Sequence, residues 1–166
     1  MSRQFDICDL HDSPPSAALL GLNNASARET SLLTAERFDQ LIRSAHIALF
    51  IPPAAALLIA FEDTDDYDGG HFLWFRGKPG RFLYIDRVVV AEEWRRRGLA
   101  RMLYDELFKR AIRLGHSRIV CEVNVRPPNP VSDKFHEALG FEEIGRATFD
   151  DGAKTVRYLA AHLRPD

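Results

Sequence analysis

The hydrophobic positions of this chain repeat with the spacing of strands in some segments and of helices in others. Alternating or continuous apolar runs predict strands over residues 5–9, 47–51, 55–61, 82–90, 118–125, 142–149 and 154–163. Apolar positions three or four apart predict helices that run from Pro14-Pro15 to near Asn23-Asn24, from Thr34 as N-cap to residue 43, from about 96 to 115, and over 132–139. This order of elements predicts an α+β fold with a mixed sheet.

One apolar stretch imitates a membrane-spanning segment. Residues 45–61 read AHIALFIPPAAALLIAF, which lies at the short edge of the roughly 17–25 residues that a spanning helix needs. Pro52-Pro53 divides the stretch, and proline interrupts a helix. We therefore interpret it as two buried strands joined by a proline turn, and expect no membrane partner.

Composition and charge predict one compact domain over residues 1–166. The chain is 46% hydrophobic and 28% charged, and its formal net charge of −2 gives no broad positive field for nucleic acid. The spacing of Cys8 and Cys121 matches neither a zinc site nor a redox pair, so we expect no metal. The first residues lack the apolar segment of a signal peptide, and with reduced cysteines this favours the cytoplasm.

A basic turn between a strand and a helix is the first candidate for chemistry. After the strand that ends in Val88, Val89 and Val90, the chain reads AEEWRRRGLAR and then continues as an amphipathic helix. The first N–H groups of a helix have no intrahelical acceptor, and the helix dipole adds partial positive charge there. The backbone of residues 96–101 could therefore hold a pyrophosphate, with Gly98 allowing close approach. The alternative is an ordinary solvated basic surface.

This turn resembles a known motif. The pattern R-x-x-G-x-A at residues 95–100 is similar to the acetyl-CoA-binding motif of the GNAT superfamily of N-acetyltransferases, and NPVSDKFHEALGF at 129–141 resembles that family's second motif, N…(L/F)-Y-x-x-L-G-F. The resemblance is good over residues 82–144. It implies a GNAT-like acyl-CoA N-acyltransferase fold, in which helices flank a central, mixed, mostly antiparallel sheet.

The resemblance also implies the residues that contact acetyl-CoA. The backbone of Val88–Val90 would pair with pantetheine as an added strand does. Asn129 would contact the CoA arm, although it also suits a turn. The full set of implied cofactor contacts is Val88, Val89, Val90, Arg95, Arg96, Arg97, Gly98, Leu99, Ala100, Arg101, Asn129, Ser132, Phe135 and His136.

Three residues are candidates for proton transfer. His136 stands where many family members have a tyrosine that donates to the leaving thiolate; it could replace that donor or only pack beside CoA. Glu122 is the first candidate for the base, because strand alternation puts it on one face with Val120 and Asn124; the alternative is a structural partner. Asp86 is the second candidate, and it could instead pair with an arginine.

The acceptor is less constrained by the sequence. Candidate contacts are Asn23, Asn24, Tyr84, Asn124 and Tyr158. The predicted walls are the first two helices, their link at 23–29 and the terminal hairpin of residues 142–163. The acidic residues of segment 62–70 could attract a cationic amine or form a solvated loop. The aromatic cluster at 71–75 could line the acceptor cleft or pack under the sheet.

The sequence thus predicts an acetyl-CoA-dependent N-acetyltransferase that acts on a primary amine by direct attack in a ternary complex. Covalent catalysis through Cys121 is disfavoured, since a thiol in a strand core stays protonated. The alternatives are transfer of a longer acyl group and a CoA-binding or regulatory module without catalysis; a nucleotide site lacks the Walker lysine pattern. The expected partner is a small-molecule or peptide amine. Strand edges could also pair in a homodimer, although no residue requires one.

Overall fold

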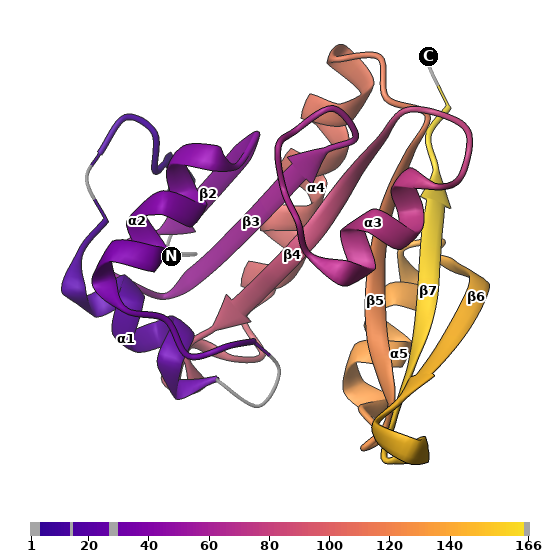
Figure 1. The fold of residues 1–166 in the computed structure, drawn as a ribbon. Helices are drawn as coiled ribbons and strands as arrows, with labels where there is room; N and C mark the ends of the chain where they lie inside the picture. The colour runs from indigo at the N-terminus through magenta and orange to yellow at the C-terminus, as the bar shows by residue number, and fades with distance from the viewer. Residues whose placement is uncertain (1–3, 14, 27–29, 165–166) are drawn as a thin grey trace. The chain divides into compact units, whose positions relative to one another are not determined.

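The computed structural model describes residues 4–13, 15–26 and 30–164, arranged as two compact units (Figure 1). Unit 1 comprises Met1–Tyr67 and Ile85–Lys109, and unit 2 comprises Asp68–Tyr84 and Arg110–Asp166. Strand β4 (Phe82–Val90) and helix α4 (Leu99–Arg113) each run from one unit into the other.

Unit 1 combines an antiparallel hairpin with two short helices. Its elements are β1 (Cys8–Asp9), α1 (Ala17–Ala25), α2 (Ala35–Ser44), β2 (Ile47–Ile51), β3 (Ala56–Glu62), the second part of β4, η1 (Glu92–Trp94) and the first part of α4. The strands pair in the order β1-β2-β3-β4. Residues 56–61 of β3 are completely buried, which explains their continuous apolar run. The hydroxyl of Thr34 accepts a hydrogen bond from the N–H of Arg37, so the predicted cap of α2 is confirmed.

Unit 2 contains the C-terminal strands. Its elements are α3 (Gly70–Arg76), the first residues of β4, the end of α4, β5 (Arg118–Arg126), α5 (Pro130–Ala138), β6 (Glu142–Phe149), η2 (Asp150–Gly152) and β7 (Lys154–His162). The strands pair in the order β4-β5-β7-β6. The β4–β5 pairing is parallel and ends at Tyr84 and Val120, whereas β5–β7 and β6–β7 are antiparallel.

Helix α3 builds an aromatic core in unit 2. Phe72 and Phe75 are completely buried and lie against the rings of Phe82 and Tyr84. Trp74 occupies the space above a glycine of β6: a Cβ added to Gly145 would lie 2.6 Å from Trp74 Cζ2. No side chain larger than hydrogen fits at position 145 without moving the indole.

The structure corrects several predicted elements. Of the strand predicted over 5–9, only Cys8–Asp9 forms a strand. The ring of Phe5 instead packs against the Trp94 ring in a T-shaped arrangement. Helix α1 follows an N-cap at Ser16, and Pro14 lies outside the described residues. The aromatic cluster 71–75 is part of helix α3, a helix that the apolar spacing did not predict. Helix α4 begins at Leu99, because Arg96 and Gly98 have positive φ angles that cannot continue a helix.

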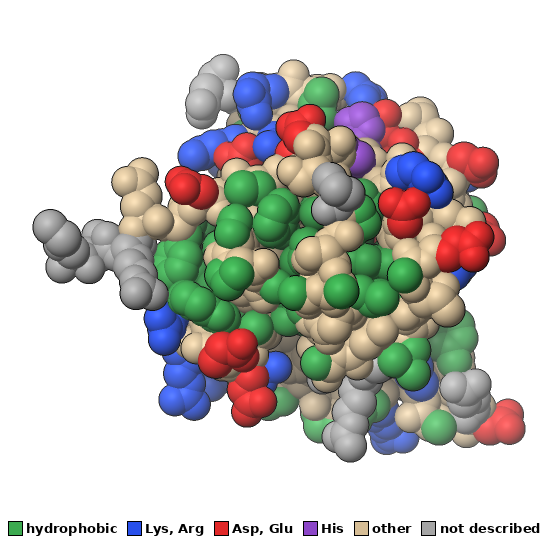
Figure 2. All heavy atoms as spheres, turned by 90° about the vertical axis from the view of Figure 1, so that its left-hand side faces the viewer, with side chains coloured by type: hydrophobic (Ala, Val, Ile, Leu, Met, Phe, Trp, Pro, Cys, Tyr) green, Lys and Arg blue, Asp and Glu red, His purple; other side chains and the backbone are tan. Residues whose placement is uncertain are grey.

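The remaining strands and helices follow the sequence pattern. The stretch 45–61 forms β2 and β3 around a proline turn, as predicted. Within the described residues, no helix is long and apolar enough to cross a membrane. Figure 2 shows hydrophobic side chains gathered at the centre of one face, with charged groups around them. Apolar area of this kind is ordinary on protein surfaces.

Candidate functional site

The arginine-rich turn of unit 1 begins where β4 ends. The N–H of Ala91 donates to the carbonyl of Ala55, which fixes the end of β4 beside the start of β3. One turn of 3-10 helix follows, and then the backbone reverses at Arg96 (φ 61°) and Gly98 (φ 76°). The first bond of α4 runs from the N–H of Met102 to the carbonyl of Gly98. The predicted strand, turn and helix are therefore all present, with the helix three residues later than expected.

This geometry suits an anion. The N–H groups at the first turn of α4, from Leu99 to Arg101, precede the first helical hydrogen bond and point along the helix axis away from its body. Arg96 and Gly98, just before the helix, have left-handed backbone conformations. Such residues can direct further backbone N–H groups towards an anion in a concave nest. A Cβ added to Gly98 would meet no atom within 4 Å, so the space above this residue is open. The turn can thus accept the oxygens of a phosphate group.

The arginine side chains surround the turn with positive charge. All four guanidinium-bearing residues at 95, 96, 97 and 101 are exposed. The guanidinium of Arg97 lies over the Trp94 ring at 4.9 Å, and Arg101 Nε pairs with Asp105 Oδ1 at 3.2 Å. These contacts orient two of the cations, but on an exposed surface they are weak enough for the side chains to turn towards a polyanion.

The end of β4 offers backbone groups on its second edge. The N–H of Ala91 points towards Ala55 at the start of β3. Successive residues of a strand direct their N–H and carbonyl groups to opposite edges. The N–H and carbonyl groups of Val88 and Val90 therefore point away from β3. Both valines are half-buried, whereas Val89 between them is buried. Arg95 Nε lies 3.5 Å from the Val90 carbonyl. The valine side chains thus pack in unit 1 while their backbone can still recognise an extended ligand.

In unit 2 the structure brings three predicted residues together. Tyr84 Oη donates a 2.9 Å hydrogen bond to Glu122 Oε2. Tyr158 lies directly opposite Glu122 in the β5–β7 register, and Asn124 lies two residues further along β5, opposite Val156. The predicted alternation along β5 is confirmed by this register. A half-buried carboxylate between two tyrosines is therefore the main candidate for acid–base chemistry.

Two residues of α3 complete this cluster, and the sequence offered them only as members of the aromatic cluster at 71–75, with no individual role. His71 Nδ1 lies 3.0 Å from Tyr158 Oη, and the Trp74 ring stacks on the Tyr158 ring at 4.0 Å. Tyr158 is only 1% exposed, and burial together with the nearby Glu122 charge raises its pKa above the ordinary value. The i, i+3 spacing of His71 and Trp74 was the available signal, because it puts both on one face of a helix.

The second motif, at 129–141, contains the whole of α5 and its N-cap. Asn129 is its N-cap, and the side-chain oxygen accepts from the N–H of Ser132 at 3.3 Å, with Pro130 at the first helical position. The turn interpretation of Asn129 is thus what the structure displays.

His136 is buried on the inner face of α5. Its Nδ1 lies 2.8 Å from the Ser132 carbonyl, which can only accept, so Nδ1 is assigned the hydrogen. The ring also meets the edges of Phe135 and Phe141. Burial lowers the pKa of His136 below its ordinary value, against the smaller opposing effect of the Ser132 carbonyl. The neutral imidazole is therefore the favoured form.

Asp86 belongs to a buried polar network of unit 1. It accepts hydrogen bonds from Tyr67 Oη and from Arg87 Nε, and the Asp86 and Arg87 side chains are each 7% exposed. Arg87 Nη1 continues the network to Asn23 Oδ1 at 2.8 Å. The ion-pair interpretation of Asp86 is thus the one that the geometry supports.

The expectation that Asn23 faces an acceptor needs correction, whereas Asn24 is half-buried and its acceptor contact stays a prediction. Asn23 is completely buried, and its amide donates to the Ser31 carbonyl and to Asn24 Oδ1. Asn24 in turn binds the N–H and carbonyl of Leu33. These amides tie α1 to the segment before α2, which leaves Asn23 no accessible surface for a substrate. Residues 27–29 of the predicted wall lie outside the described residues.

Cys121 is an unsuitable nucleophile. It lies in β5, and its pKa is raised well above the ordinary value by burial and, to a smaller extent, by the neighbouring Glu122 charge. A thiol that stays protonated attacks a thioester poorly. This agrees with the expectation that transfer does not pass through a cysteine.

Comparisons with known proteins connect both units to one family. The profile of the acetyltransferase (GNAT) family matches residues 23–141. Aminoglycoside N(6')-acetyltransferase type 1 of Salmonella typhimurium is 27% identical over 114 residues, which cover 67% of this chain and 73% of that protein.

Solved structures share the fold at low identity. The NatC complex bound to Gag peptide and CoA contains a chain with a TM-score of 0.70 at 15% identity, covering 97% of this chain and 98% of that one. A GNAT family acetyltransferase from Elizabethkingia anophelis with acetyl-CoA bound gives 0.67 at 12% identity, with 98% and 100% covered. The predicted α+β fold is thereby confirmed as the fold of these acetyltransferases.

Proposed function

The chain belongs to the GNAT family of N-acetyltransferases, and on that premise we propose that it transfers the acetyl group of acetyl-CoA to a primary amine by direct attack within a ternary complex. The observation that carries the proposal is the turn at 95–98, where two positive φ angles lead into the exposed N–H groups of α4. The profile spans parts of both units, and this supports a single acetyltransferase domain over residues 1–166.

The proposed contacts to acetyl-CoA follow from the geometry of unit 1. The backbone N–H groups of residues 96–101 bind the pyrophosphate, and the exposed arginines at 95, 96, 97 and 101 neutralise its charge. The outward N–H and carbonyl groups of Val88 and Val90 pair with the amides of pantetheine. In unit 2, α5 contributes through Asn129, Ser132 and Phe135, as the family resemblance implies.

Glu122 is the proposed base. During transfer the amine nitrogen forms a bond to the acyl carbon, the carbon–sulfur bond breaks, and the nitrogen loses one proton. Glu122 accepts that proton directly or through one water, and the departing thiolate takes up a proton. Tyr84 holds the carboxylate by its 2.9 Å hydrogen bond and so fixes its direction. Tyr84 is accordingly a positioning residue.

His136 and Asp86 receive structural roles in this proposal. The one hydrogen of neutral His136 is donated to the Ser132 carbonyl, so donation to a thiolate would need the imidazolium, which burial disfavours. We therefore assign His136 to positioning α5. Asp86 is committed to Tyr67 and Arg87 inside unit 1 and supports the strand that leads to the turn.

The proposed acceptor is a small-molecule or peptide amine. The Salmonella relative is named for aminoglycosides, and the NatC structure holds a peptide, so these are the two acceptor classes to compare first. Within unit 2, Asn124 and the carboxylate of Glu122 provide polar contacts for the ammonium group of an approaching substrate. The buried Tyr158 lies opposite Glu122 on β7 and forms part of the wall of the site.

A thiol-release assay tests the proposal. Three mixtures of the protein with acetyl-CoA are compared: one with an aminoglycoside, one with a short peptide that has a free N-terminus, and one without an amine. Free CoA is measured in each, and the acetylated product is identified by mass. Amine-dependent release supports the proposal. CoA binding without release would support the regulatory module instead, and release only from a longer acyl-CoA would support the other acyltransferase.

A further inference from the structure

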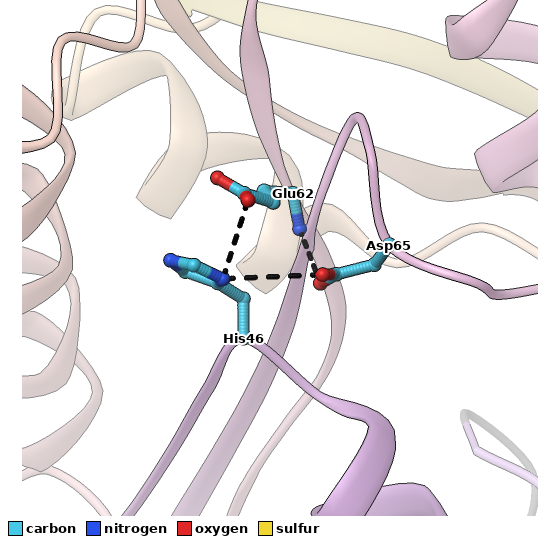
Figure 3. Close-up of side chains that lie close together, drawn as sticks. All are labelled: His46, Glu62 and Asp65. Atoms are coloured by element: carbon cyan, nitrogen blue, oxygen red, sulfur yellow. Dashed lines mark hydrogen bonds and ion pairs between the residues drawn. The ribbon is translucent and has the colours of Figure 1, made fainter.

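Three side chains capable of binding a metal meet at one end of the β2–β3 hairpin. His46 directly precedes β2, Glu62 is the last residue of β3, and Asp65 follows in the next turn (Figure 3). The antiparallel register pairs Ile47 with Ala60, which brings the start of β2 beside the end of β3. The fold thus joins residues that are up to 19 positions apart, a spacing that no metal motif of the sequence would have indicated.

The distances within this cluster are short enough for one metal ion to bind all three side chains. His46 Nδ1 lies 3.5 Å from Glu62 Oε1 and 3.9 Å from Asp65 Oδ1. Both separations exceed the roughly 2.7–3.2 Å of a good N–H···O hydrogen bond. Ligand atoms bonded tetrahedrally to one ion at about 2.1 Å lie about 3.4 Å apart. All three ligand atoms fall within 4.8 Å of one another, so small side-chain movements close the site.

The carboxylates are already oriented by their own hydrogen bonds. Asp65 Oδ2 accepts from the N–H of Glu62 at 2.8 Å, and Thr64 Oγ1 donates to Glu62 Oε1 at 3.0 Å. Such partners fix the direction of ligand groups in metal sites. The side chains of Glu62 and Asp65 are only 16% and 17% exposed, which limits competition from water.

Charge in the cluster also favours a cation. The carboxylate oxygens that Glu62 and Asp65 offer lie within 4.8 Å of each other. A divalent ion between the carboxylates would remove the repulsion between them. One imidazole nitrogen with two carboxylates selects a transition metal over Mg²⁺ or Ca²⁺, which prefer oxygen ligands alone.

We propose that His46 Nδ1, Glu62 and Asp65 form a site for Zn²⁺ or a similar divalent transition metal, with water at the remaining position. The ion would join β2, β3 and the turn after β3. Further along the same segment, Tyr67 stacks on Phe61 at 3.9 Å and donates to Asp86. Metal binding therefore stabilises the segment that supports Asp86. This site is separate from the proposed acetyl-CoA contacts.

Calorimetric titration with Zn²⁺ tests the site. The metal-free protein, the variants His46→Asn and Asp65→Asn, and the control His162→Asn are compared, with circular dichroism as a check of folding. His162 is an exposed histidine at the end of β7. Mg²⁺ and Ca²⁺ serve as competing hard cations, and a Cys8→Ser background removes a half-buried thiol.

The proposal expects one equivalent of Zn²⁺, at least tenfold weaker binding in each cluster variant, and unchanged binding in His162→Asn. It also expects a higher melting temperature with Zn²⁺ in the wild type alone. Equal affinity in wild type and His46→Asn, or no binding by the folded wild type, overturns it. If His46→Asn fails to fold, the Asp65→Asn titration decides.

Discussion

Tyr84 Oη on β4 donates a 2.9 Å hydrogen bond to Glu122 Oε2 on β5, across 38 positions of sequence. The short parallel pairing of the two strands makes this contact, because Tyr84 is paired with Val120 and strand alternation puts Glu122 on the same face. The carboxylate is thus held by a partner that the sequence offered only as a substrate contact.

Replacing Glu122 with Gln should lower turnover by about 10²-fold at neutral pH, because the amide cannot accept the amine proton. The loss should shrink at high pH, where more of the acceptor arrives already neutral. Rate–pH profiles of thiol release measure this, with Glu142→Gln on the exposed part of β6 as the matched control. An equal loss at every pH would instead indicate a structural role for Glu122.

Replacing Tyr84 with Phe should reduce kcat several-fold and leave the affinity for acetyl-CoA unchanged. The phenyl ring keeps the packing against Phe72 and Phe75 but removes the hydrogen bond to Glu122. Steady-state kinetics with acetyl-CoA and amine varied separately gives both values. A matching change in acetyl-CoA affinity would contradict the positioning role.

The lowered pKa of His136 predicts that the free energy of unfolding depends on pH. Its pKa is lowered in the folded state, so as pH falls below about 6.5 the unfolded chain takes up a proton that the folded chain does not. The free energy of unfolding should therefore fall as the pH drops below about 6.5, and this part of the slope should be absent in His136→Phe. Denaturant unfolding at several pH values provides the comparison.

The same variant separates packing from catalysis. If His136 positions α5, turnover of His136→Phe should stay within a few-fold of wild type wherever the variant is folded. A loss of about 10²-fold with normal stability and normal acetyl-CoA affinity would instead identify His136 as the proton donor.

The sequence could predict the strands and the basic turn, because their apolar runs and the Gly98 pattern are local. It could not choose between the two roles of Asp86, since that choice depends on Tyr67 and Arg87 being brought into contact with it in unit 1. Helix α3 escaped prediction for a different reason. Its seven residues start at Gly70 and are too short for a clear helical period, and the aromatic core holds them in place.

Removing one partner of the Asp86–Arg87 ion pair should lower the free energy of unfolding. Asp86→Asn leaves a buried guanidinium short of its counter-charge, at a cost of roughly 3–5 kcal/mol in the free energy of unfolding. The double variant Asp86→Leu with Arg87→Met should cost less than the sum of its single variants. Denaturant unfolding measures all of them. Normal stability with lost turnover in Asp86→Asn would restore Asp86 as a candidate base.

The central claim is that the turn around Gly98 binds acetyl-CoA, and thermal unfolding tests it most directly. Wild type, Gly98→Glu and Gly152→Glu are melted with acetyl-CoA, with ATP and without ligand. Both glycines have positive φ and open space at Cβ, so the two variants share the backbone strain, but only position 98 adds negative charge at the turn. At a hundredfold excess over Kd, acetyl-CoA should stabilise wild type and Gly152→Glu by about 2.7 kcal/mol. It should not stabilise Gly98→Glu, and ATP should have little effect on any of them. No stabilisation of the folded wild type, or equal stabilisation of Gly98→Glu, would contradict the assignment of this turn to acetyl-CoA.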